Sequence, residues 1–156
     1  MQEINTQTLS VSQWYTMAQE GISVPVTIRL AGYSMQPLLR KDRDPVTVMP
    51  VYRPPKIGDI VMFLRADGVY VMHRVSALEN EMVITIGDNC IHPDHPMHRS
   101  MVLGLAVRAQ RGPLKLNLDC PGSRIYGRIW MTTRPVRVLL YYARRVASKL
   151  KHKLCR

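Results

Sequence analysis

Residues 58–75, GDIVMFLRADGVYVMHRV, hold two β-rich runs on either side of the dipeptide Asp67-Gly68. Asp-Gly between two such runs is a strong signal for a hairpin turn, because both residues tolerate positive φ angles. We therefore expect strands over 59–64 and 68–75 that pair antiparallel. This hairpin indicates that the fold is mainly β.

Similar β-rich runs occur before and after this hairpin. We expect them to form strands at 24–30, 45–52, 81–86 and 101–110. Gly104, inside the last of these runs, indicates a bulge or a close approach of another backbone. Several short antiparallel strands predict a closed or partly closed, β-barrel-like sheet.

Helices are expected mainly near the two ends of the chain. Residues 7–20, QTLSVSQWYTMAQE, have the pattern of a short amphipathic helix that ends at Gly21. A second short helix can begin at Ser34, which would lie near the positive end of its dipole. After Pro135, apolar residues recur at three- and four-residue steps and basic residues fall mainly opposite, so 136–154 is predicted to be an amphipathic basic helix.

The formal net charge of +11 belongs to the C-terminal part of the chain. Residues 1–119 contain 12 Lys and Arg against 11 Asp and Glu, whereas residues 120–156 contain ten Lys and Arg and no acidic residue. We therefore predict a compact domain over 1–119 and a basic tail over 120–156. The tail fits a solvated face or an anionic membrane surface bound through 136–154, with nucleic acid as the weakest of three alternatives.

The cysteines and the N-terminal residues favour a reducing, cytoplasmic setting. Cys90, Cys120 and Cys155 are odd in number and widely spaced, so no disulfide framework is expected. The first residues, MQEINTQTLSVSQ, have neither the basic nor the apolar region of a signal peptide. No apolar run is long enough for a transmembrane helix. We expect a cytoplasmic protein or one held peripherally at the cytoplasmic membrane.

Four short blocks bring together residue types suited to nucleophilic catalysis. They are GYSMQP at 32–37, GDIV at 58–61, MHRV at 72–75 and GDNC at 87–90, and Asp94 follows the last. A serine hydroxyl is a poor nucleophile unless a neighbouring base accepts its proton. His73 is the candidate base for Ser34, and Asp94 or Asp88 would orient its ring. The blocks predict a serine peptidase that needs neither a metal nor an organic cofactor.

In order and spacing these blocks resemble those of signal peptidase I, in the group of serine peptidases that also holds the LexA-type repressors. The resemblance spans roughly residues 28–108 and implies Ser34 as the nucleophile. Because no lysine lies near the MHRV block, it is the histidine type that the chain resembles, with His73 as the base and with aspartates at 88 and 94. The resemblance implies leader or signal peptides, cut after small residues, as substrates. Gly32 stands where some members have a serine that donates to the oxyanion.

Other roles for the same residues remain open from sequence alone. Ser34 fits a helix N-cap, His73 a buried structural histidine, and Asp88 a turn residue. Zinc is a further alternative, because thiolate and imidazole are its preferred ligands. The residues concerned are Cys90, His92, His95 and His98, but prolines at 93 and 96 interrupt their spacing and we expect no metal.

Two functions compete with a peptidase that acts on other proteins. A LexA-like regulator that cleaves its own chain would need a DNA-binding module, and the residues before Ser34 are too few for one. A catalytically silent β domain that binds peptide or membrane is the second alternative. Such a domain has no chemical need for Ser34, His73 and Asp94 together.

Overall fold

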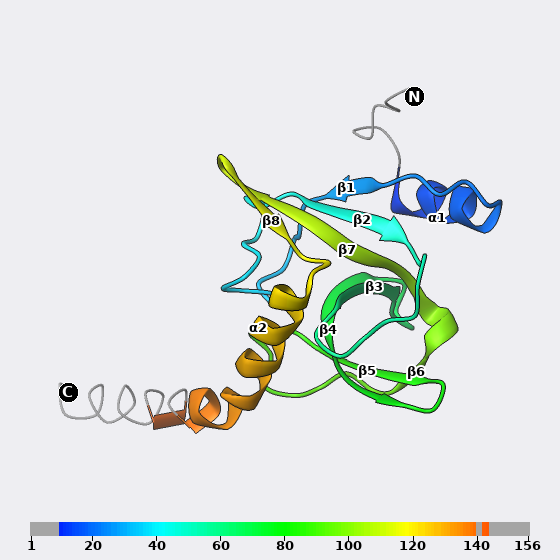
Figure 1. The fold of residues 1–156 in the computed structure, drawn as a ribbon. Coiled ribbons are helices and arrows are strands. Elements are labelled where there is room, and N and C mark those ends of the chain that lie inside the picture. Colours follow the sequence, from blue (N-terminus) through cyan, green and yellow to red (C-terminus); the bar gives the residue numbers. More distant parts are fainter. Residues whose placement is uncertain (1–9, 140–141, 144–156) are drawn as a thin grey trace, which may run out of the picture.

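The computed structural model describes residues 10–139 and 142–143. Within them the chain forms one curled antiparallel sheet of eight strands, shaped like a half-barrel (Figure 1). The strand order is β1-β2-β7-β3-β4-β5-β6, and β8 pairs with β7. The strands are β1 Val26–Ile28, β2 Val46–Pro50, β3 Ile60–Leu64, β4 Tyr70–Glu79, β5 Met82–Ile86, β6 Met97–His98, β7 Val102–Arg111 and β8 Leu114–Asn117. The predicted mainly β, antiparallel fold is confirmed.

The hairpin predicted from Asp67-Gly68 joins β3 to β4. Leu64 pairs with Tyr70, and the pairing continues along both strands until Ile60 faces Arg74. Gly68 has a φ of +80°, and its N–H donates to the Arg65 carbonyl in the turn. Strand β4 continues four residues past the predicted end at Val75, to Glu79, where it pairs with β5. The hairpin thereby places His73 in the middle of the sheet.

Strand β7 lies at the centre of the sheet between β2 and β3. Its residue 104 must be glycine, because neighbouring atoms leave no room for a side chain. A Cβ added there would lie 2.6 Å from the Met49 carbonyl oxygen and 2.8 Å from the Trp14 ring. Real Cβ atoms do not come so close to other atoms, so only glycine fits. The predicted close approach at Gly104 is confirmed.

Helix α1, Val11–Gln19, packs at one end of the sheet. Ser10 caps it, and its side chain and that of Gln13 form a reciprocal capping box. Trp14 is buried and its indole N–H donates to the Val24 carbonyl, which ties the helix to the segment before β1. Gly21 follows the helix with a φ of +82°, as expected for its end. Residues 7–9 of the predicted helix lie outside the described part.

The prediction of a helix that begins at Ser34 is wrong. Residues 34–38 form hydrogen-bonded turns instead, with the Leu39 N–H donating to the Met35 carbonyl. Pro37 disfavours helical backbone at the residue before it, Gln36, and this opposes a helix over these residues. Met35 and Leu39 are buried and anchor the turn in the core, while Ser34 is half-buried.

The C-terminal part contains a helix and a strand that the sequence analysis did not predict. Helix α2, Pro121–Thr132, has Cys120 as its N-cap and lies beside β4 (Figure 1). Strand β8, a short run with exposed side chains, extends the edge beside β7. Helical residues resume at 134–139, close to the predicted start at Pro135, but most of the predicted helix at 136–154 lies outside the described residues. Of the helices that the structure describes, none combines the length and the apolar character that crossing a bilayer requires.

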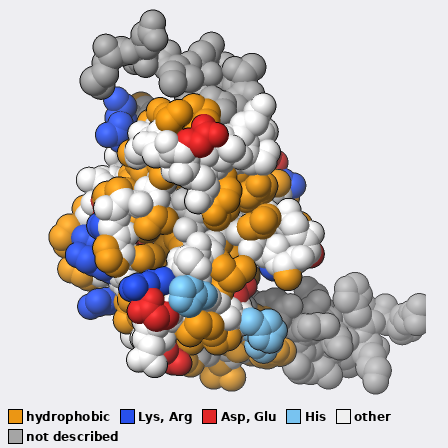
Figure 2. Space-filling view, turned by 90° about the vertical axis from the view of Figure 1, so that its right-hand side faces the viewer, with side chains coloured by type: hydrophobic (Ala, Val, Ile, Leu, Met, Phe, Trp, Pro, Cys, Tyr) orange, Lys and Arg blue, Asp and Glu red, His pale blue; other side chains and the backbone are white. Residues whose placement is uncertain are grey.

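Two apolar clusters form the core on the faces of the curled sheet. One is centred on Trp14, Met35 and Val48, and the other on Phe63, Val75 and Leu105. Hydrophobic side chains also occupy much of the outer face turned to the viewer in Figure 2, with charged side chains between them. His73 and Arg74, on β4, are polar residues within this largely apolar interior.

Candidate functional site

His73 forms a short hydrogen bond with Asp94, the second aspartate predicted to belong to the site. Its Nδ1 lies 2.6 Å from Asp94 Oδ2, and the Thr85 hydroxyl donates to the same oxygen over 2.6 Å. The Asp94 N–H also donates to the Thr85 carbonyl, so β5 holds the aspartate from both its backbone and its side chain. When the ring is neutral, this contact places the proton on Nδ1 and leaves Nε2 as the acceptor. That is the tautomer a general base requires.

The surroundings of His73 favour its charged form. Burial lowers the pKa of His73, but hydrogen bonding to Asp94 and to Cys90 outweighs burial and raises the pKa to about 9. Burial alone would raise the pKa of Asp94, whereas hydrogen bonds from His73 and Thr85 lower it. The Phe63 ring meets the imidazole edge-on at 6.2 Å and contributes to its burial. The pair therefore rests as imidazolium and carboxylate at neutral pH, and the neutral base becomes available as pH rises.

The turn that carries Ser34 is fastened to the Gly87–Cys90 turn. The Asn89 N–H donates to the Ser34 carbonyl over 2.7 Å. A Cβ added at Gly87 would lie 2.7 Å from that carbonyl oxygen and 3.0 Å from Ser34 Cβ, so only glycine permits this approach. Glycine at the start of the GDNC block thus brings the backbone of Ser34 against the loop that leads to Asp94.

Cys90 lies near the Ser34 turn and also interacts with His73. A Cβ added at Gly87 would lie 2.6 Å from the Cys90 sulfur, in addition to its close contacts with Ser34. The interaction of the Cys90 side chain with His73 contributes to the raised pKa of the ring. Ser34 and Cys90 therefore meet at Gly87, and Cys90 in turn interacts with His73, which is bound to Asp94.

The backbone around Ser34 leaves a donor for a developing oxyanion. Among the described residues, none accepts a hydrogen bond from the Ser34 N–H. An N–H adjacent to the attacking hydroxyl is the usual first donor to the tetrahedral intermediate. Gly32 has no side chain and therefore offers no side-chain donor. The space where a side chain would stand is open.

Asp88, the other aspartate predicted for the site, is held by Arg74 and not by His73. The Arg74 Nε and Nη2 atoms donate to its two carboxylate oxygens over 2.8 and 2.7 Å. Both side chains are completely buried. With both oxygens engaged in this ion pair, Asp88 braces the GDNC turn, while Asp94 makes the contact with His73.

Arg74 joins three of the sequence blocks and helix α2. Besides its ion pair with Asp88, it donates through Nη1 to the Gly58 carbonyl over 2.8 Å. Gly127 of α2 lies against the guanidinium, and a Cβ there would be 2.5 Å from Nη1. The Trp130 indole donates to the Asp88 carbonyl from the same helix. Helix α2 is thereby packed on the residues that support the candidate site.

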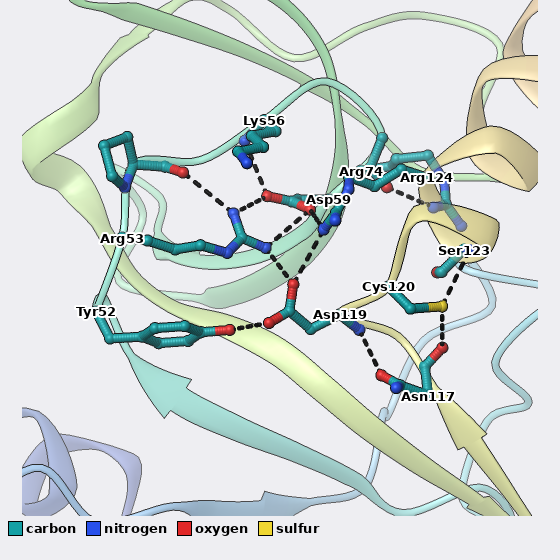
Figure 3. Close-up of polar contacts among 12 residues, drawn as sticks. Tyr52, Arg53, Lys56, Asp59, Arg74, Asn117, Asp119, Cys120, Ser123 and Arg124 are labelled. Atoms are coloured by element: carbon teal, nitrogen blue, oxygen red, sulfur yellow. Dashed lines mark hydrogen bonds and ion pairs between the residues drawn. The ribbon is translucent and has the colours of Figure 1, made fainter.

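A second ion-pair cluster fixes the start of α2 to the GDIV block (Figure 3). Asp59 accepts hydrogen bonds from Arg53, from Arg124 of α2 and from the Lys56 N–H. Asp119, just before the helix, is bound by Arg53, Arg124 and Tyr52. A Cβ at Gly58 would lie 2.7 Å from the Arg124 carbonyl oxygen, so the GDIV glycine also makes room for the helix. The residues of this cluster make their hydrogen bonds to one another, which fits a structural role.

The zinc alternative has no support in the described residues. No group of three or more His, Cys, Asp or Glu side chains among them is arranged to hold a metal ion. Of the candidate ligands, Cys90 interacts with His73, whereas His98 is the N-cap of the short 3₁₀ helix η1, Arg99–Met101, and its ring is hydrogen-bonded to Ser100 within that helix.

Comparison with protein-family models, with curated proteins and with solved structures gives no match to this chain.

Several residues of the site were missed by sequence reasoning. Thr85 looked like one more β-branched residue in a strand, and its hydroxyl contact with Asp94 has no local sequence signature. Arg74 was visible beside His73, but its ion pair with Asp88 depends on the register of β4 against β5, where Arg74 faces Ile86. Cys90 was considered only as a zinc ligand.

Proposed function

We propose that the chain is a serine endopeptidase of the signal-peptidase type that cleaves leader or signal peptides after small residues. The observation that carries the proposal is the short contact between His73 and Asp94, together with Cys90, which interacts with His73 and lies near the turn that holds Ser34. The four sequence blocks that resemble signal peptidase I contribute these same residues. A Ser/His/Asp arrangement of this kind performs acyl transfer on several unrelated folds.

The proposed mechanism uses Ser34 as nucleophile and His73 as proton carrier. The Ser34 Oγ attacks the peptide carbonyl while Nε2 of neutral His73 takes its proton, and the Ser34 N–H donates to the oxyanion. The imidazolium, stabilised by Asp94, then protonates the leaving amine and the C–N bond breaks. A water molecule, deprotonated by the same Nε2, hydrolyses the acyl-enzyme and frees Ser34.

The proposal is tested by cleavage of a peptide library that contains Ala-x-Ala segments, with the products identified by mass spectrometry. We expect cuts after small residues with the unaltered protein and none above the uncatalysed background with Ser34→Ala. Ser100→Ala, an exposed serine in the same chain, is the matched control and should cleave normally. Equal turnover by Ser34→Ala would remove the serine from the mechanism. Binding of the library without any cleavage would favour the silent binding domain.

We further propose that the C-terminal part meets an anionic membrane surface, which would present tethered leader peptides to the site. Val136 and Leu139 are exposed by 60 % and 69 %, and Ile125 and Ile129 of α2 are exposed by more than half. Basic residues near an anionic surface each contribute ~1 kcal/mol. Deleting residues 144–156, which contain six Lys and Arg, should release the protein from phosphatidylserine vesicles in a sedimentation assay. Unchanged vesicle binding would contradict this role.

A further inference from the structure

A cavity of about 250 Å³ opens beside the Gly87–Cys90 turn. Its walls are formed by Asn89, Cys90, Ile91, Arg134, Arg137 and Val138. Asn89 holds the Ser34 carbonyl, and Cys90 interacts with His73. The cavity therefore adjoins the residues to which we assign catalysis, and its opposite wall comes from the segment that follows α2.

Arg137 is fixed in the wall of this cavity by neutral groups. Its guanidinium stacks on the Trp130 ring at 3.8 Å and donates to the Asp88 and Trp130 carbonyls. It makes no ion pair with a carboxylate in the described part of the chain. Asp88 cannot supply one, because Arg74 occupies both of its carboxylate oxygens.

Arg134 adds a second positive charge to the cavity wall. The Nε atoms of both Arg134 and Arg137 are buried and lack a hydrogen-bond partner among residues 10–139 and 142–143. Burial is the main cause that lowers the pKa of Arg137; the nearby charge of Asp88 raises it, and the positive charge of Arg134 lowers it. Two neighbouring guanidinium groups whose Nε–H donors lack an acceptor are unfavourable, and an anion bound between them would offset that cost.

We propose that this two-arginine cavity binds a carboxylate of the peptide substrate and so selects which peptides reach Ser34. The inference rests on the proposed peptidase function. A guanidinium presents a planar set of donors that fits the two oxygens of a carboxylate, and each such charged hydrogen bond is stronger than a neutral one. The carboxylate belongs either to an Asp or Glu side chain near the cut or to the C-terminus of a short peptide.

The test measures binding to Ser34→Ala protein, so that cleavage does not interfere. The probes are three N-acetylated hexapeptides with the same Ala-x-Ala segment: one with Glu and a C-terminal amide, one with Gln and a free C-terminus, and one with Gln and a C-terminal amide. We expect at least one acidic peptide to bind about tenfold more tightly than the fully neutral one in calorimetry. That peptide should also shift the Nε–H signals of Arg134 and Arg137 in NMR spectra. The acidic peptide that shows both effects identifies the source of the carboxylate.

Arg134→Gln should abolish the preference for the acidic peptide, and Arg134→Lys should retain part of it. Arg128→Gln, an exposed arginine of α2 outside the cavity, is the matched control and should keep the full preference. Equal binding of acidic and neutral peptides, no binding of any of them, or a preference that survives Arg134→Gln would overturn the inference. Loss of vesicle binding in Arg134→Gln without a carboxylate preference would assign the arginines to lipid headgroups instead.

The same experiments separate this inference from the proposed function. If the unaltered protein cleaves acidic and neutral peptides equally well, the peptidase stands and the carboxylate site fails. If acidic peptides bind through Arg134 but the unaltered protein cleaves none of them, the site stands and the peptidase fails.

Discussion

The two aspartates of the candidate site lie close together in the sequence but in different environments. Asp88 is completely buried and its carboxylate is shared with the equally buried Arg74. Asp94 keeps 26 % of its side chain exposed and faces His73, which can gain or lose a proton. Both contacts are short, 2.7 and 2.6 Å, so bond length does not distinguish them.

The difference lies in what each partner can do. An arginine does not give up its proton in a protein, so Arg74 stays charged and its ion pair with Asp88 only supports the structure. Histidine changes its charge near neutral pH, so the His73–Asp94 pair can take part in proton transfer. Two carboxylates six residues apart therefore separate into a structural one and one suited to catalysis.

The largest effect is expected from Asp94→Asn. An amide in place of the carboxylate no longer fixes the Nδ1–H tautomer or stabilises the imidazolium. In a Ser/His/Asp arrangement that loss lowers kcat by about 10⁴. Cleavage kinetics with the best peptide of the library provide the measurement. The free energy of unfolding at neutral pH should also fall, because Asp94 is a cause of the raised pKa of His73 and of the stabilisation that goes with it.

Asp88→Asn should act through stability and not through the histidine, because Asp88 contacts Arg74. The substitution leaves the buried charge of Arg74 without a partner, and breaking a buried ion pair in this way costs about 3–5 kcal/mol of folding free energy. Urea unfolding measures the loss. If Asp88→Asn were as stable as the unaltered protein, or if Asp94→Asn kept normal kcat, the assignment of the two aspartates would be reversed or wrong.

The pH dependence should follow His73. With its pKa raised to about 9, the neutral base becomes about tenfold scarcer with each pH unit below that value, so kcat/KM should rise from neutral pH toward pH 9. The free energy of unfolding should change in the opposite direction and decrease as pH rises. A folded-state pKa above the ordinary value of 6.5 gives stabilisation that is complete below about pH 6.5 and is lost as pH rises through about 9.

NMR titration of the His73 ring tests this prediction directly. Asp94→Asn should lower its pKa, whereas Arg128→Gln should leave it unchanged. A titration midpoint at or below 6.5 in the unaltered protein would contradict the pairing of His73 with Asp94.

The smallest effect is expected from Gly127→Ala in α2. Alanine normally favours a helix over glycine, but here the new Cβ would lie 2.5 Å from Arg74 Nη1 and 2.8 Å from its Cδ. Arg74 cannot move aside, because its guanidinium is bound to Asp88 and Gly58. We expect a loss of about 1–3 kcal/mol in urea unfolding, as for other overpacked sites.

Gly122→Ala, in the same helix, is the control for that substitution. The nearest atom to its added Cβ is 3.8 Å away, so alanine should be neutral or slightly stabilising there. A gain of stability in both variants would show that α2 does not press on Arg74.

Most of the sheet was predictable from sequence, because six of its eight strands carry local signals; the short strands β6 and β8 were not predicted. Alternating apolar residues and the Asp67-Gly68 turn place the strands to within a few residues, and Gly104 marks the crowded centre of β7. Helix α2 was missed because Pro121, Gly122 and Gly127 resemble loop residues. They form a helix because proline suits its first turn and Gly127 fits against Arg74. Local helix propensity carries no information about that contact between Gly127 and Arg74.

The candidate site was predictable to a similar extent. Ser34, His73 and Asp94 could be named from the order and spacing of the blocks. Their partners could not, because the contacts of Thr85 with Asp94 and of Arg74 with Asp88 depend on how strands and loops meet in space. The helix expected at Ser34 failed for a local reason, the proline three residues later.

The central claim is that Ser34 is a nucleophile activated by His73, and covalent labelling tests it most directly. A fluorophosphonate probe reacts with an activated serine hydroxyl, and mass spectrometry of the digested protein locates the adduct. We expect the adduct on Ser34 in the unaltered protein and its loss in His73→Gln. An unlabelled Ser34, or equal labelling with and without His73, would contradict the claim.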